Sequence, residues 1–157
     1  MAKADKIVTY VLMVSRYFPA THPRKGLPTF FLSKIDEGEK KHTIRANYEL
    51  WKNKIERINR GEAVLELRYW EGKPYRSKQI TFKTFKQGEV GIQKLQRKTA
   101  ELVDGRHYVI DGDTQPTLIT VTLAKNDGLG VYDFMDWFVG GFGVNPKAII
   151  HFTKFRY

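Results

Sequence analysis

The chain has 157 residues, 41% of them hydrophobic, and a formal net charge of +10. This length fits one globular domain over residues 1–157, and the absence of cysteine excludes a disulfide scaffold, a zinc ribbon, an iron–sulfur cluster and a thiolate nucleophile. The charge is uneven, because residues 1–100 carry 22 lysines and arginines against 10 aspartates and glutamates, whereas residues 101–157 carry 5 against 7. A first part with a net charge of +12 attracts polyanions such as RNA, DNA or anionic lipid; a solvated surface tuned for solubility is the alternative.

Near its start the chain is predicted to form a buried strand. Residues 7–15 are rich in β-branched and aromatic side chains, and prolines and a glycine indicate a loop over residues 16–28. The apolar run is broken by Thr9 and Tyr10 and lacks a small-residue cleavage site, so we do not expect a signal peptide. No stretch approaches the roughly 18 apolar residues that span a bilayer, so we expect a cytoplasmic protein without a membrane partner.

Two helices are expected next. Residues 29–37 place apolar side chains at helical spacing, and Gly38 is the natural stop. Asn47 is placed to cap a second helix over residues 48–60, in which Trp51, Ile55 and Ile58 form an apolar stripe.

The rest of the chain favours strands. Residues 62–70 and 75–85 predict a β-hairpin, and residues 86–106 give a weak pattern with no clear element. We further expect strands at 107–110, 117–123 and 148–157, and a helix at 131–139 that ends at Gly140-Gly141. Without regular strand–helix alternation, these elements predict an α+β, mainly β domain, built as a small β-barrel with two or three short helices.

Several standard catalytic and metal-binding motifs are missing from the sequence. None of the three serines lies in a G-x-S-x-G elbow, and the four histidines lie far apart, without a metal-ligand spacing. The glycines at 128–130 and 140–143 lack a Walker lysine or a dinucleotide fingerprint, so we interpret them as turns. We therefore expect no metal and no cofactor.

The segment from Gly38 to Arg45, GEKKHTIR, resembles the G-x-K-x-x-T-x-R signature of the ASCH domain, a branch of the PUA-like β-barrels. Phe30 and Phe31 precede it at the expected distance. The segment containing Asp133 and Trp137, and the last predicted strand, look like the family's closing helix and strand. The resemblance covers roughly residues 28–85 and 117–157, which leaves an N-terminal extension at 1–28 and an insertion at about 86–116.

This resemblance implies a cleft over the signature that binds RNA or a nucleotide derivative. One bacterial branch of the family consists of acetylcytidine amidohydrolases, which use a lysine and a threonine of the signature and a downstream glutamate. In this chain the lysine is Lys40 and the threonine is Thr43, and the downstream acid falls at Asp127, an aspartate one methylene shorter than the family's residue.

The chemistry of such a site follows from its residue types. A lysine crowded by Lys41 and Arg45 and partly desolvated has a lowered pKa, which suits a general base. Thr43 is then either the nucleophile or the holder of a water, and Arg45 or a backbone N–H stabilises the oxyanion. If the cleft only binds, Lys40, Lys41 and Arg45 contact phosphate or a base edge and Thr43 adds a hydroxyl bond.

The predicted hairpin offers a second basic surface. Arg68, Tyr75, Arg76 and Lys78 interleave cations with an aromatic ring, which suits single-stranded nucleic acid. The leading hypothesis is a monomeric RNA- or modified-nucleotide-binding domain. The alternatives are a small amidohydrolase acting on an acylated nucleoside and a structural or protein-interaction domain.

Overall fold

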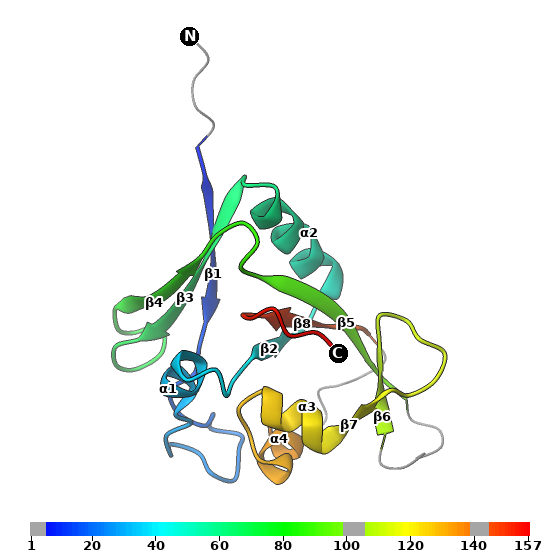
Figure 1. Ribbon diagram of the computed structural model, residues 1–157. Coiled ribbons are helices and arrows are strands. Elements are labelled where there is room, and N and C mark those ends of the chain that lie inside the picture. Colours follow the sequence, from blue (N-terminus) through cyan, green and yellow to red (C-terminus); the bar gives the residue numbers. More distant parts are fainter. Residues whose placement is uncertain (1–5, 99–105, 139–144) are drawn as a thin grey trace.

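The strands form two sheets. The computed structural model of the protein describes residues 6–98, 106–138 and 145–157 (Figure 1). Its strands are β1 (Val8–Met13), β2 (His42–Arg45), β3 (Ala63–Trp70), β4 (Gln79–Phe85), β5 (Gly91–Arg97), β6 (Arg106–Ile110), β7 (Leu118–Ile119) and β8 (Lys147–His151). Its helices are α1 (Phe31–Asp36), α2 (Tyr48–Asn59), α3 (Thr120–Asn126) and α4 (Val131–Trp137).

The sheet topology confirms the α+β, mainly β class but differs from the expected barrel. One sheet has the order β1-β3-β4, with β1 parallel to β3 and β3–β4 an antiparallel hairpin. The other has the order β2-β8-β5-β6-β7, with every pair antiparallel. The described strands therefore form two open sheets and not one closed barrel.

Helix α2 joins the two sheets, and Figure 1 shows it beside β3 and above β5. Its N-terminus is capped as expected, because the side chain of Asn47 accepts a hydrogen bond from the backbone N–H of Leu50. The apolar stripe of Trp51, Ile55 and Ile58 is buried against β3 of one sheet and β5 and β8 of the other. Burial of this stripe is what makes one hydrophobic core of the two sheets.

Two predicted strands end early. Over residues 117–123 only Leu118 and Ile119 are strand, and Thr120 begins α3. The β-branched residues there favour a strand locally, but the helix buries Leu123 and leaves Val121 exposed, so tertiary packing overrides propensity. The last strand stops at His151, and residues 152–157 lie outside it.

The segments expected to be an N-terminal extension and an insertion contribute strands to the two sheets. The segment 86–116 contains β5, in which the buried Gly91, Gln93 and Leu95 alternate, and β5 lies between β8 and β6. Strand β1, from the expected N-terminal extension, pairs with β3 along its whole length. It lies at the edge of its sheet and Leu12 is its one buried residue, so the prediction of a buried strand there is wrong. The expected helix at 131–139 is α4, whereas its last residue and Gly140-Gly141 lie outside the described residues.

Candidate functional site

A small pocket is lined by residues of α1, β2 and the α3–α4 region, and its volume is about 140 Å³. Its polar lining consists of Ser15, Lys40, Thr43, Arg45 and Asp127. Its aromatic walls are Phe31, Trp137 and Phe138, and apolar residues including Leu129 complete it. The structure thus brings together the three residues expected to be catalytic, from positions 40, 43 and 127, with the expected arginine.

Hydrogen bonds to the backbone on either side of Asp127 hold this residue against the signature segment. The N–H of Lys41 donates to the carbonyl of Asn126 over 2.8 Å, and the ammonium of Lys34 donates to the carbonyl of Gly128 over 2.7 Å. Gly128 has φ +83°, and a Cβ there would lie 3.1 Å from the Cβ of Lys40. A glycine is favoured at this position because it turns the chain in the left-handed region and leaves room for the stem of Lys40.

Lys40 and Asp127 form a buried ion pair. The amine of Lys40 donates to the carboxylate Oδ1 of Asp127 over 3.1 Å and to its backbone carbonyl over 2.6 Å. The side chains are only 3% and 6% exposed. The same amine lies 4.2 Å from the ring centre of Phe31, so one aromatic wall also faces the charge.

Burial and neighbouring charges shift the ionisation of both members of the pair. Burial lowers the pKa of Lys40, and the attraction of Asp127 offsets only part of this effect, with Arg45 lowering it further. Burial alone would raise the pKa of Asp127, but the Lys40 ammonium and His42 outweigh it and hold the pKa below its ordinary value. Asp127 is therefore an anion, and Lys40 gives up its proton more readily than a free lysine.

Thr43 and Arg45 form the second polar wall. The guanidinium of Arg45 donates to Thr43 Oγ1 over 2.7 Å and to the carbonyls of Ile44 and Met13 over 2.9 and 2.7 Å. Burial lowers the pKa of Arg45. Asp127 is the one carboxylate among the described residues that line the pocket, so the two cations Lys40 and Arg45 face a single anion.

The loop over residues 16–28 closes the aromatic side of the pocket. The ring of Trp137 on α4 lies 5.6 Å from that of Phe18, and also 5.6 Å from that of Phe31, between ring centres. Arg24 donates to the Asp133 carboxylate over 2.6 Å, which fastens the loop to the first turn of α4. The expected extension therefore helps to hold a pocket wall.

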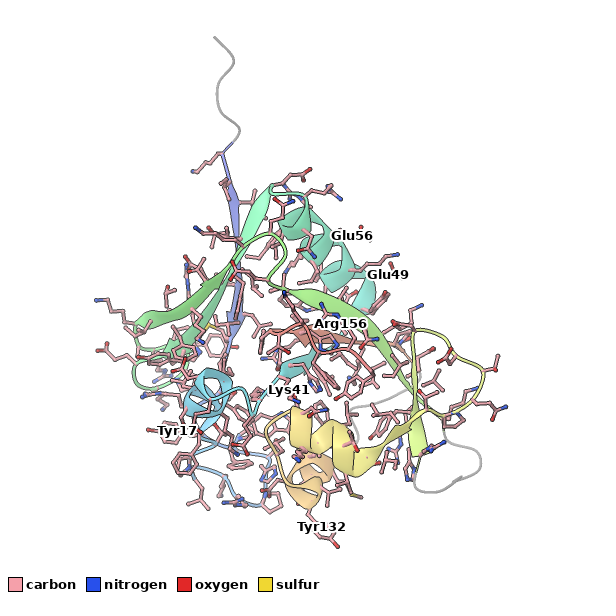
Figure 2. The ribbon with its side chains drawn as sticks, in the orientation of Figure 1. Tyr17, Lys41, Glu49, Glu56, Tyr132 and Arg156 are labelled. Atoms are coloured by element: carbon pink, nitrogen blue, oxygen red, sulfur yellow. The ribbon has the colours of Figure 1, made fainter. Side chains whose placement is uncertain are left out.

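The other expected ligand-binding residues do not line the pocket. Lys41, labelled in Figure 2 at the start of β2, places its amine 4.7 Å from the ring centre of Phe155. Arg68 pairs with Glu66 over 2.5 Å on β3, and Tyr75 is 89% exposed in the hairpin turn with its ring 5.2 Å from that of Trp70. Arg76 and Lys78 are also exposed in that turn.

Two histidines that are far apart in sequence are neighbours in the fold. The register of β2 and β8 pairs His42 with His151, and their ring centres lie 5.5 Å apart. Within the described ranges, no group of three or more His, Cys, Asp or Glu side chains is placed to hold a metal ion. Among those same ranges, no helix combines the length and apolar character needed to cross a membrane.

Sequence reasoning missed several residues of the site. Phe31 and Trp137 have the apolar spacing of core residues, which gives no sign that they face a pocket. His42 contacts Asp127, and Tyr157 contacts His42. His42 stands at a position where the signature specifies no residue type. Only the pairing of β2 with β8 shows that these residues belong to one cluster.

Comparison with known proteins gives no match. No family model, no curated protein and no solved structure matches the chain.

Proposed function

We propose that this protein is a small amidohydrolase that cleaves the amide bond of an acylated nucleoside, such as acetylcytidine. The observation that carries the proposal is the meeting of Lys40, Thr43 and Asp127 in one buried pocket beside Arg45. A binding site for a polyanion has no need of a buried carboxylate, because that carboxylate repels phosphate. The resemblance of GEKKHTIR to the ASCH signature supports the same assignment.

Lys40 serves as the general base and acid in this mechanism. Its lowered pKa makes the neutral amine accessible, and Asp127 stabilises the ammonium that forms when the amine takes a proton. The amine removes the proton of Thr43 or of a water held by Thr43, and the oxygen attacks the amide carbon. Lys40 then returns that proton to the departing exocyclic amine. If Thr43 is itself the attacking group, a water afterwards hydrolyses the acyl-threonine.

Arg45 stabilises the oxyanion. One of its nitrogens lies 2.7 Å from Thr43 Oγ1, so its charge is next to the attacking oxygen or the water that Thr43 holds. Arg45 pairs with no carboxylate among the described residues, and its positive charge is therefore available to the negative charge that develops on the carbonyl oxygen.

The size and walls of the pocket favour one planar heterocycle. Its volume of about 140 Å³ is well below the roughly 300–1,000 Å³ of pockets that hold drug-sized ligands. Phe31, Trp137 and Phe138 offer aromatic faces on which a base stacks. A single modified base fits these dimensions better than a folded polynucleotide.

The proposal is tested by incubating micromolar protein with a panel of N-acylated cytidines, adenosines and guanosines and identifying the products by chromatography. We expect release of the free nucleoside and the carboxylic acid from at least one acylated base. Lys40→Met is expected to lower kcat by about 10²- to 10⁴-fold, the usual contribution of general acid–base catalysis. A panel left intact would overturn the proposal.

Binding of RNA without catalysis is the second candidate, favoured by a different observation. The exposed hairpin turn carries Arg76 and Lys78 beside the neighbouring rings of Trp70 and Tyr75, within the part of the chain that carries +12. The candidate predicts an affinity for single-stranded RNA that falls steeply with salt. RNA affinity that is undetectable at low salt would remove it.

A further inference from the structure

A chain of buried polar groups continues from the pocket into the core. His42 is fully buried, and its Nε2 lies 2.5 Å from the hydroxyl of Tyr157, while its Nδ1 lies 3.4 Å from Oδ1 of Asp127. The hydroxyl of Tyr157 also receives a hydrogen bond from the side-chain amide of Asn126 over 3.2 Å. None of these three groups enters the reaction steps above.

The donors and acceptors of this chain favour one tautomer of His42. Because the Asp127 carboxylate only accepts hydrogen bonds, a hydrogen on the ring nitrogen that faces it is favoured over a lone pair. In the neutral ring Nε2 then accepts, and Tyr157 donates to it. The amide of Asn126 donates to the Tyr157 oxygen, which leaves the tyrosine hydrogen free for His42.

We propose that His42 is a positioning residue for Asp127, with its Nδ1–H aimed at the Oδ1 atom that also receives the Lys40 amine. The inference rests on the proposed function, since it matters for catalysis only if Lys40 acts there. Nδ1 has no hydrogen-bond partner in the described part of the chain, and the 3.4 Å contact is longer than an ordinary hydrogen bond. Contacts of this kind tighten when a ligand fills the site.

His151 supplies an internal control. Gln93 donates its amide to the Asp111 carboxylate, so its oxygen is the acceptor that faces His151 Nε2 at 3.0 Å. His151 must therefore carry its hydrogen on Nε2, and its Nδ1 has no partner within the described residues. We therefore expect the two neighbouring histidines to be opposite tautomers.

Long-range ¹H–¹⁵N NMR of the full chain near pH 7 tests the arrangement without any substrate. We expect His42 to be protonated at Nδ1 and His151 at Nε2. In Tyr157→Phe, which keeps the ring and removes the donor, we expect the His42 signals to show a mixture of tautomers. A wild-type His42 protonated at Nε2 would overturn the inference.

Kinetics then test the consequence for catalysis. Asn places its amide N–H near the position of Nδ1, whereas Gln places its amide nearer Nε2. We therefore expect His42→Gln to lower kcat by on the order of 100-fold with little change in KM, and His42→Asn to recover most of that loss. Thermal unfolding of both variants checks that each is folded.

The two proposals fail in different ways. If wild-type protein cleaves no acylated nucleoside but His42 is protonated at Nδ1, the proposed function is wrong and the arrangement of His42 stands. If wild-type protein is active and His42→Gln has the same kcat, the positioning role is wrong and the proposed function stands.

Discussion

The pocket and the β3–β4 hairpin turn both combine cations with aromatic rings, yet these side chains are largely buried in the pocket and largely exposed in the turn. In the pocket, Lys40 donates a hydrogen bond to Asp127 and Arg45 donates one to Thr43, and Lys40 is only 3% exposed. In the hairpin turn, Tyr75 is 89% exposed, and Arg76 and Lys78 face solvent. Burial turns a cation into a group with a fixed direction and a shifted pKa, whereas exposure leaves it part of a general positive field.

The sharpest test of this contrast removes one member of the buried pair. Lys40→Met leaves the Asp127 charge buried without its partner, so we expect the free energy of unfolding to fall by about 3–5 kcal/mol. Lys40→Met/Asp127→Leu removes both charges and should recover much of this stability without recovering activity. Urea unfolding measures the difference, and equal stability of the single and double variants would contradict it.

Acid should destabilise the protein through its buried histidines. Burial lowers the pKa of His151 to about 3 and also lowers the pKa of His42. The unfolded chain therefore binds more protons than the folded chain between about pH 3 and 6.5, so stability rises with pH across this window and is lost as pH falls.

The expected slope is up to about 1.4 kcal/mol per pH unit for each such histidine. Urea unfolding at a series of pH values measures it, and His151→Gln should flatten it. A stability that is constant from pH 6.5 to 4 would show that these histidines are not held neutral.

Gly128→Ala tests the close approach of the backbone to Lys40. The left-handed φ costs an alanine about 1–2 kcal/mol, and its Cβ would lie 3.1 Å from the Cβ of Lys40. Gly112→Ala is the matched control, because Gly112 has φ +79° and nothing within 4 Å. We expect a larger loss of stability from Gly128→Ala than from Gly112→Ala, because only the former adds a close contact with Lys40, and a fall in kcat from Gly128→Ala alone.

The smallest effects are expected in the hairpin turn. Arg76→Ala and Lys78→Ala remove exposed cations, so the free energy of unfolding should change by no more than about 0.5 kcal/mol. If RNA binds there, the variants should lower its affinity modestly and reduce the salt dependence by about one ion per cation removed. Loss of stability comparable to that of Lys40→Met would erase the distinction between the two regions.

The sequence correctly predicts those helices and strands whose hydrophobic periodicity matches the side chains that they bury. The cap at Asn47 and the stripe of Trp51, Ile55 and Ile58 in α2 are examples, since both depend on neighbours within a few residues. Residues 120–123 were predicted as strand because β-branched side chains have a local preference that packing against the core overrides.

In the site, too, local sequence patterns do not reveal residues that only tertiary packing brings together. Lys40 and Thr43 are close in sequence, and a resemblance to a known signature singled them out. Asp127 stands 87 residues from Lys40, and the same resemblance pointed to it. His42 and Tyr157 gave no signal, because their roles depend on the pairing of β2 with β8 and on where residues 152–157 return to the core.

The most direct test of the central claim is kcat/KM of purified protein on acetylcytidine, measured for wild type, Thr43→Ser and Thr43→Val. Thr43→Ser keeps the hydroxyl and Thr43→Val replaces it with a methyl group of similar size. We expect measurable release of cytidine by wild type and Thr43→Ser, and a loss of at least about 100-fold in Thr43→Val. A wild-type protein that is inert on acetylcytidine and on every other acylated nucleoside of the panel, or a Thr43→Val variant as active as wild type, would contradict the account.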